Sequence, residues 1–233
     1  MDIVERFINY TKINTTTSRE NGANGIMPSS PGQMELAKLL AAELEALGME
    51  NIEVRDTAIV TATLPANTDD TIPVVSFFGH LDTSAEQTAD TKAQRLHYHG
   101  GDLCLNKELN IYLRESEFPE LKNYIGDDLL VTDGTSLLGA DDKAAIAAIM
   151  NALEYLVAHP EIKHGPVKVG LSRMRNRACV AQKRLMLPRL VLILAIPWIA
   201  AVSVSLFTRT GMRAMRKSSL PASPHTRCRP KVS

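Results

Sequence analysis

Acidic residues are confined to the first 170 positions of this 233-residue chain, which limits the part that can form an ordinary globular domain. All 26 Asp and Glu residues lie between residues 1 and 170, whereas 13 of the 26 Lys and Arg residues lie in 171–233. Globular sequences contain about one quarter charged residues, of both signs. The formal net charge of zero is therefore the sum of an acidic part and a basic part. We expect the composition, and with it the folding behaviour of the chain, to change near Gly170.

Hydrophobic periodicity in the first 170 residues predicts alternating helices and strands. Helical spacing of apolar residues occurs in 2–12, in a helix that begins at Pro31 and stops at Gly48, and in 142–158. Short apolar runs predict strands at 52–55, 58–64, 73–79 and 129–132 and from residue 166, whereas 84–127 gives no clear pattern. This alternation favours a layered α/β domain. The expected buried positions of the last helix are Ala145, Ile146, Ile149, Leu153, Leu156 and Val157.

Two polar residues follow an apolar strand that we expect to be buried. His80 and Asp82 come directly after Phe77-Phe78-Gly79, with only Leu81 between them. Residues i and i+2 of a strand point to the same face, so the two side chains should emerge together. Both are costly to bury without a partner. This segment alone fits a hydrogen-bonded structural pair as well as it fits a metal site.

A second polar cluster lies where a turn meets the last predicted helix. Asp141 and Asp142 follow Gly139-Ala140, and aspartates at a helix start commonly cap it and interact with its dipole. Capping is thus the simpler explanation of this segment by itself. Together, the two clusters offer an imidazole, a carboxylate ligand and a second carboxylate to orient the imidazole, as in the metal sites of α/β hydrolases. Two ligands alone still cannot hold one tetrahedral zinc.

Three segments resemble the peptidase T family of tripeptide aminopeptidases, within the wider group of peptidases with two co-catalytic zinc ions. They are "ERFINYTKINTTTS" (5–18), "GHLDTS" (79–84) and "TDGTSLLGADDKA" (132–144), and the resemblance extends over about residues 1–170. It departs at Ala145, where the family usually has glycine. The resemblance implies part of a three-layer zinc-peptidase catalytic domain, a mixed sheet flanked by helices.

The resemblance also implies roles for individual residues. His80 corresponds to a terminal ligand of one zinc, and Asp141 to the carboxylate that bridges both zincs. Asp82 corresponds to the catalytic-site acid that hydrogen-bonds the His80 ring, and the Asp141–Asp142 peptide bond to one that is often cis. The implied reaction is metal-assisted hydrolysis of the first peptide bond of small peptides in the cytoplasm, with a glutamate as general base.

The acids that should complete this site do not occur after Gly170. Where the family has the glutamate base and a ligand of the second zinc, this chain reads "LSRMRN" (171–176), and the remainder contains one histidine, His225. Codons for residues 173–176 can be chosen that read Asp-Glu-Glu in another frame. We therefore predict that 1–170 is the N-terminal part of the catalytic domain. Residues 171–233 would be a frameshifted tail rather than a domain, which would leave the chain truncated and inactive.

Other interpretations of the tail are less well supported. Residues 190–207 form an apolar run barely long enough to span a membrane, so a membrane-tethered, non-catalytic binding domain is the alternative function. Pro197 and the polar Ser203 and Ser205 weaken this alternative. A nucleic-acid partner is disfavoured because the arginines are scattered and no known module is present. The acidic N-terminus does not resemble a signal peptide, and three widely spaced cysteines favour a reducing compartment. The sequence does not indicate an oligomeric state.

Overall fold

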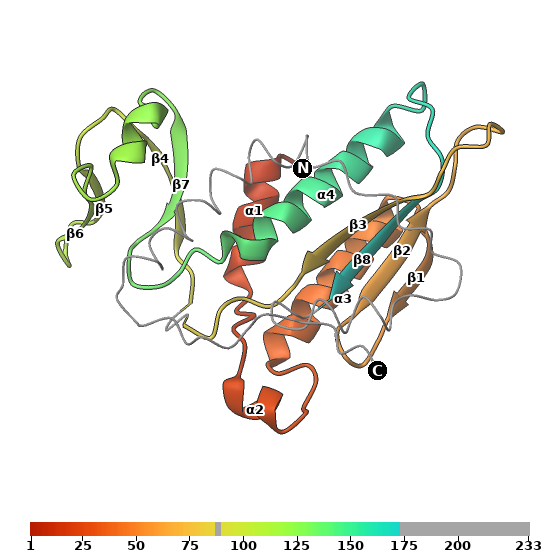
Figure 1. The fold of residues 1–233 in the computed structure, drawn as a ribbon, viewed down its shortest axis with the longest axis horizontal. Helices are drawn as coiled ribbons and strands as arrows, with labels where there is room; N and C mark the ends of the chain where they lie inside the picture. Colours follow the sequence, from red (N-terminus) through yellow and green to blue (C-terminus); the bar gives the residue numbers. More distant parts are fainter. Residues whose placement is uncertain (87–89, 173–233) are drawn as a thin grey trace, which may run out of the picture.

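The computed structural model describes residues 1–86 and 90–172, and its largest sheet is a mixed four-stranded sheet, on the right in Figure 1. The strand order is β1 (Glu50–Val54), β2 (Val60–Leu64), β8 (Val167–Ser172) and β3 (Val75–His80). β3 runs parallel to β8, whereas β2 is antiparallel to both of its neighbours. The last residue pair between β3 and β8 is His80 with Ser172, so the predicted polar cluster begins where this pairing ends.

The helices α1 (Ile3–Lys12), α3 (Pro31–Ala46) and α4 (Ala140–Ala158) share one buried core with the sheet. Alternate residues of β2 and β8 point into this core, among them Ala62 and Val169, which pair across the two strands. Figure 1 shows α3 behind the sheet, with α1 and α4 beside its β3 edge. The predicted α/β class, a mixed sheet flanked by helices, is confirmed.

The helix boundaries follow the local sequence signals closely. Pro31 is the first residue of α3, and Gly48 follows its end with a φ of 74°, a left-handed conformation that favours glycine. In α4, Ile146, Ile149 and Leu153 are buried as predicted. Val157 is 42% exposed, so its predicted burial is wrong, because the last turn of α4 extends past the buried core.

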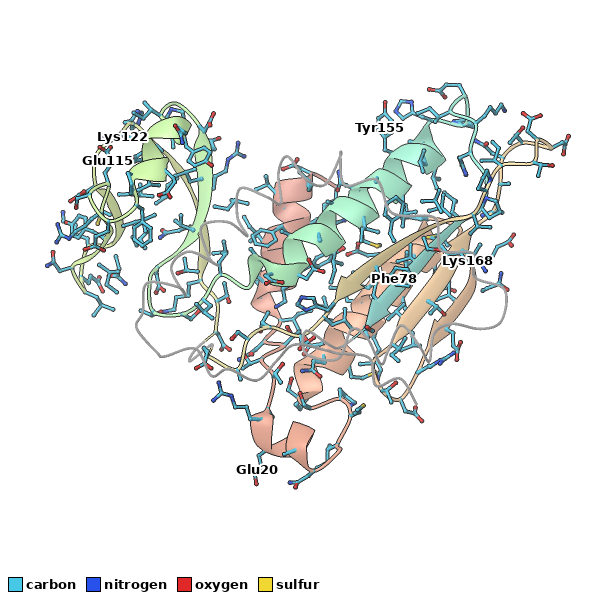
Figure 2. The ribbon with its side chains drawn as sticks, viewed as in Figure 1. Glu20, Phe78, Glu115, Lys122, Tyr155 and Lys168 are labelled. Carbon is cyan, nitrogen blue, oxygen red and sulfur yellow. The ribbon has the colours of Figure 1, made fainter. Side chains whose placement is uncertain are left out.

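β3 is less buried than its apolar sequence predicts. Phe77 packs against the core, whereas Phe78 points to the opposite face and is 42% exposed. Gly170 pairs with Phe78, and a Cβ atom at Gly170 would collide with the Phe78 ring. Figure 2 shows Phe78 and Lys168 on this part of the sheet. The helices described above pack on the other face, so the prediction of a fully buried strand is wrong for the part of the chain that the structure describes.

The segment 84–127, which the sequence left unassigned, contains short strands and one short 3-10 helix. β4 (Ala93–His97) pairs antiparallel with β7 (Asp128–Thr132), and β5 (Leu103–Asn106) pairs antiparallel with β6 (Ile111–Leu113). A 3-10 helix, η1 (Pro119–Tyr124), precedes β7, and the loop after α1 contains a five-residue helix, α2 (Arg19–Ala23). These elements are only three to six residues long, so they leave little periodic signal in the sequence.

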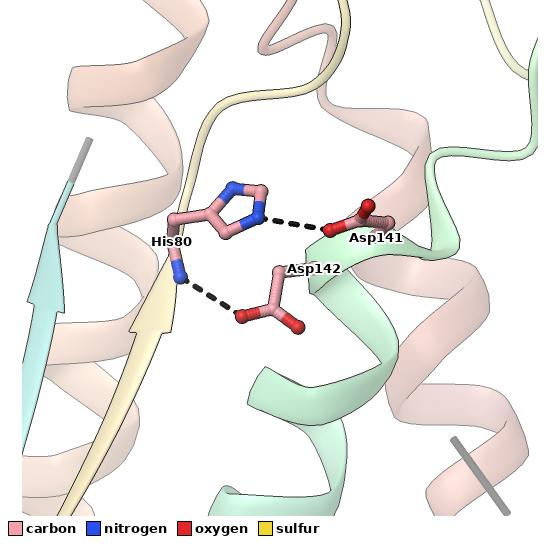
Figure 3. A group of neighbouring side chains, drawn as sticks. All are labelled: His80, Asp141 and Asp142. Atoms are coloured by element: carbon pink, nitrogen blue, oxygen red, sulfur yellow. Dashed lines mark hydrogen bonds and ion pairs between the residues drawn. The ribbon is translucent and has the colours of Figure 1, made fainter. Parts of the chain in front are cut away.

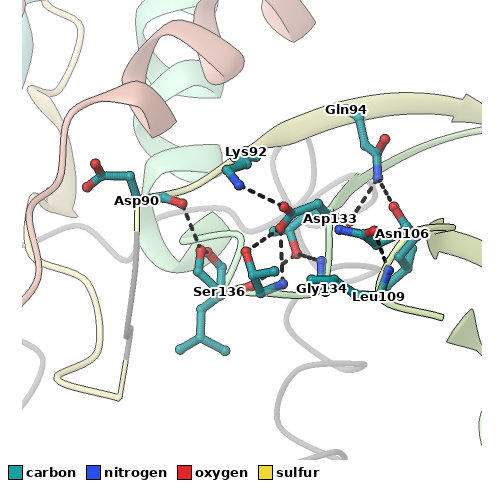
Figure 4. A network of polar contacts seen from close by, with 12 residues as sticks. Asp90, Lys92, Gln94, Asn106, Leu109, Asp133, Gly134 and Ser136 are labelled. Carbon is teal, nitrogen blue, oxygen red and sulfur yellow. Dashed lines mark hydrogen bonds and ion pairs between the residues drawn. The ribbon is translucent and has the colours of Figure 1, made fainter. Parts of the chain in front are cut away.

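The turn after β7 leads the chain towards α4 and is stabilised by the Asp133 carboxylate (Figure 4). Asp133 Oδ1 accepts hydrogen bonds from the backbone N–H and the hydroxyl of Thr135, at 3.0 and 2.6 Å. Its Oδ2 lies 3.2 Å from Lys92 Nζ. Gly134 has a φ of 79°, a left-handed conformation that favours glycine. This part of the "TDGTS" segment therefore has a structural role, since it connects β7 to the residues that precede Asp141.

The predicted tail lies outside the described residues except at its first two positions. Leu171 and Ser172 continue β8 and pair with Gly79 and His80. The apolar run 190–207 and the basic residues after 172 cannot be compared with the structure, and the division at residue 170 stays a prediction. Among the described helices, none is both long enough and apolar enough to cross a bilayer.

Replacing Gly32 by alanine is expected to destabilise the fold. Gly32 lies in the first turn of α3, and a Cβ atom there would overlap the backbone carbonyl oxygen of Asn14. Because backbone must move to make room, we expect a loss of about 1–3 kcal/mol in the free energy of unfolding. Urea unfolding would measure it, with Gly22→Ala in α2 as the control, since a Cβ at Gly22 meets nothing within 4 Å. Equal stability of the two variants would contradict the packing described here.

Candidate metal centre

The fold brings the two polar clusters of the sequence together at the end of β3 (Figure 3). His80 is the last residue of β3, and Asp141 and Asp142 lie in the first turn of α4. His80 Nε2 lies 2.9 Å from Asp141 Oδ1, although the two residues are 61 positions apart. The backbone N–H of His80 donates to Asp142 Oδ2 at 3.1 Å. The peptide bond between Asp141 and Asp142 is cis, as the resemblance implies.

The donor atoms of this cluster suit a metal ion such as zinc. One ligand atom from each of His80, Asp141 and Asp142 lies within 4.8 Å of the others, the one such group found in residues 1–86 and 90–172. Zinc binds imidazole nitrogen and carboxylate oxygen at about 2.0–2.2 Å, which separates two tetrahedral ligand atoms by about 3.3 Å. The 2.9 Å between Nε2 and Oδ1 would need to widen by only a few tenths of an ångström. The residues present therefore fit a metal.

The His80 ring is held in the orientation that a metal ligand requires. Its Nδ1 atom lies 2.9 Å from the backbone carbonyl oxygen of Asp82 and 3.5 Å from Asp82 Oδ1. Both of these atoms are acceptors, so Nδ1 carries the proton and donates it. Metal-binding histidines generally donate their second ring N–H to a carbonyl or carboxylate in this way. Nε2 is then directed at Asp141.

The three carboxylates around His80 dominate the electrostatics of the site. Burial by itself would lower the pKa of His80, but the hydrogen bonds to Asp141 and Asp82 and the charge of Asp142 raise it to about 10. Burial would raise the pKa of Asp82, but the His80 ring 3.5 Å away and the hydrogen bond from Thr17 hold it below its usual value. The site thus stabilises positive charge beside Asp141.

The sequence of this chain is similar to the sequences of known proteins. No protein-family model matches the chain. Peptidase T of Geobacillus kaustophilus (strain HTA426) is 50% identical to it over 173 residues, which cover 73% of this chain and 41% of that protein. Peptidase T of Caldanaerobacter subterraneus subsp. tengcongensis is 51% identical over 172 residues, with the same two shares. Over the matched residues, this chain is similar to the peptidase T family, with about half of the positions identical.

The chain spans about two fifths of the length of these peptidase T relatives. Among solved structures, the aminopeptidase PepT from Bacillus cereus ATCC 10987 superimposes with a TM-score of 0.52 and 22% identity. That superposition covers 81% of this chain and 40% of the other. At this identity the likeness shows a shared fold, which agrees with the α/β class predicted from the peptidase T resemblance.

Sequence reasoning assigned Asp142 to helix capping and to the peptide bond after Asp141, and gave its carboxylate no contact with His80, whereas the structure places the carboxylate against the His80 backbone. The N-cap position of α4 is Gly139, and both aspartates have non-helical backbone angles. Asp142 Oδ2 accepts the hydrogen bond from the His80 backbone and so ties the end of β3 to the start of α4. The adjacent acid in "GADDKA" was the available signal. It could not indicate which of two neighbouring carboxylates faces the imidazole ring and which faces the backbone.

Proposed function

We propose that residues 1–170 form the N-terminal part of the catalytic domain of a peptidase T-like zinc aminopeptidase. The intact enzyme would release the N-terminal residue from tripeptides in the cytoplasm. The observation that carries this proposal is the approach of His80 Nε2 to Asp141 Oδ1, at 2.9 Å, in a chain that is 50% identical to a peptidase T over 173 residues. Small peptides are the proposed substrates. The closeness of one histidine and two aspartates supports metal binding at this site. The choice of zinc as the metal rests on the resemblance to peptidase T.

Each of the three predicted site residues has a proposed role that its contacts support. His80 would bind zinc through Nε2 while its Nδ1–H is held by Asp82. Asp141 would supply carboxylate oxygen, and its two oxygens suit the bridging role that the family implies. Zinc, when bound, would polarise the peptide carbonyl and make water a better nucleophile. No general base is assigned to this chain, because residues 171–233 contain no acid.

Metal binding by the purified chain is the direct test of this proposal. Zinc affinity can be measured by competition with a chromophoric chelator, and the number of bound ions by elemental analysis. We expect saturable binding that depends on both His80 and Asp141. Binding that is unaffected when either residue is replaced would overturn the proposed site.

Asp82→Asn is expected to weaken metal binding without abolishing it. The asparagine keeps the shape of the side chain and the backbone carbonyl that lies 2.9 Å from His80 Nδ1, but it removes the negative charge. Partners of this kind usually contribute about 10–100-fold to metal affinity. Chelator competition would measure the change, and Asp128→Asn in β7 is the control, since the Asp128 carboxylate binds His97 and Arg95 instead. A loss as complete as that expected for His80→Ala would instead make Asp82 a direct ligand.

A further inference from the structure

The Asp82 carboxylate depends on a hydrogen bond from the loop that follows α1. Asp82 is 6% exposed, and its Oδ2 accepts a hydrogen bond from the Thr17 hydroxyl at 2.9 Å. Its Oδ1 faces His80 Nδ1 at 3.5 Å and makes no hydrogen bond within the described part of the chain. A buried carboxylate with one fixed oxygen has little freedom to rotate. Thr17 therefore determines which way the second oxygen points.

Thr17 is itself held in place by pairing with the residue next to Asp82. Its backbone N–H donates to the carbonyl oxygen of Thr83 at 3.1 Å, and the Thr83 N–H donates to the carbonyl oxygen of Thr15, also at 3.1 Å. These bonds form a short parallel bridge between Thr16 and Thr83. The hydroxyl of Thr17 is thus fixed relative to the backbone that carries Asp82.

The same segment is anchored to the helix that carries Asp141. Lys143 of α4 is almost fully buried, and its Nζ donates to the carbonyl oxygen of Ile13 at 2.6 Å. The Asn14 carbonyl packs directly on Gly32 of α3. Residues 13–17, which we call the threonine segment, therefore connect the start of α4 with the end of β3. The threonine segment thus contacts both parts of the chain that carry residues of the proposed metal centre.

We propose that Thr17 is a positioning residue of the metal centre. Its hydroxyl holds the Asp82 carboxylate so that Oδ1 faces the His80 ring, which keeps the ring directed at the metal. This inference rests on the proposed function, because it assigns Thr17 a role in that same site. The role belongs to the hydroxyl group, so serine should preserve it and valine, which has nearly the same shape, should not.

Metal affinity of three variants of the 233-residue chain tests this role. Thr17→Val is expected to lower the affinity for zinc and for cobalt(II) about tenfold, the lower end of the range for residues that support a ligand. It should also shift the visible absorption spectrum of bound cobalt(II), which reports ligand geometry. Thr17→Ser should restore most of the affinity and the wild-type spectrum. Thr16→Val is the control, because the Thr16 hydroxyl bonds to Asn14 instead.

The outcomes separate this inference from the proposed metal site. Wild-type affinity and spectrum in Thr17→Val would overturn the role of Thr17 while leaving the site intact if His80→Ala still loses the metal. Equal weakening by Thr17→Ser and Thr17→Val would also overturn it, since a hydroxyl effect must be rescued by serine. An unaffected His80→Ala variant would overturn the metal site itself. If Thr17→Val does not fold, as judged by circular dichroism, Thr17→Ala replaces it with the same expectation.

Discussion

The 233-residue chain is expected to show no hydrolysis of tripeptides, even with excess zinc. The described residues bring together His80, Asp141 and Asp142, and the sequence after Gly170 contains no carboxylate that could act as general base. A positioned general base alone contributes roughly 10²–10⁴-fold to such reactions. An incomplete metal site would lower the rate of hydrolysis further. Release of the N-terminal residue should be followed with purified chain from a host that lacks its own peptidases.

Restoring the reading frame near codon 170 provides the control for this experiment. We propose that residues 171–233 arise from a frameshift, so a one-base insertion or deletion there should recover the acids that the peptidase T family places after this point. The restored protein should then turn over tripeptides at an ordinary enzymatic rate, about 1–10³ per second. Turnover at that rate by the unrestored chain would show that its tail is functional. Sequencing the DNA around codon 170 tests the frameshift independently.

The sequence predicted the main elements of the fold because their signals are local. The apolar stripes of α1, α3 and α4 and the proline that begins α3 lie within the elements they specify, and the glycine that ends α3 lies two residues after it. The strands of 84–127 gave no such signal, because they are only three to five residues long. The exposure of Phe78 was not predicted either. An apolar strand can be buried on both faces, but its own sequence does not show whether other elements pack on each face.

The candidate site could be predicted only as far as its motifs extend. His80 and Asp141 were found through "GHLDTS" and "GADDKA", and the structure brings them within 2.9 Å. Thr17 lies in the "ERFINYTKINTTTS" segment, but that segment indicated no role for it, because its hydrogen bond to Asp82 spans 65 positions and depends on how the loop after α1 pairs with Thr83. The contact of His80 Nδ1 with the Asp82 carbonyl was likewise not predictable, since it depends on the backbone path just after β3.

His80→Ala is expected to abolish metal binding by this chain and, in the frame-restored protein, activity as well. The substitution removes the one imidazole of the cluster and leaves two carboxylates, a donor set that holds zinc poorly. Alanine keeps the backbone N–H that donates to Asp142, so the connection between β3 and α4 should persist. The loss of affinity should therefore exceed the roughly 10–100-fold expected for a supporting residue. Chelator competition and the cobalt(II) spectrum would measure it.

His97→Ala is the matched control for that loss. His97 is an exposed residue of β4, and its Nδ1 bonds to Asp128 at 2.8 Å, so its replacement makes the same chemical change away from the proposed centre. We expect His97→Ala to bind zinc like the unsubstituted chain, whereas His80→Ala should not bind it measurably. Thermal melting of both variants would separate ligand loss from unfolding. Full zinc occupancy in a folded His80→Ala variant would mean that the imidazole at the end of β3 is a structural partner of the carboxylates, which is the alternative that the sequence left open.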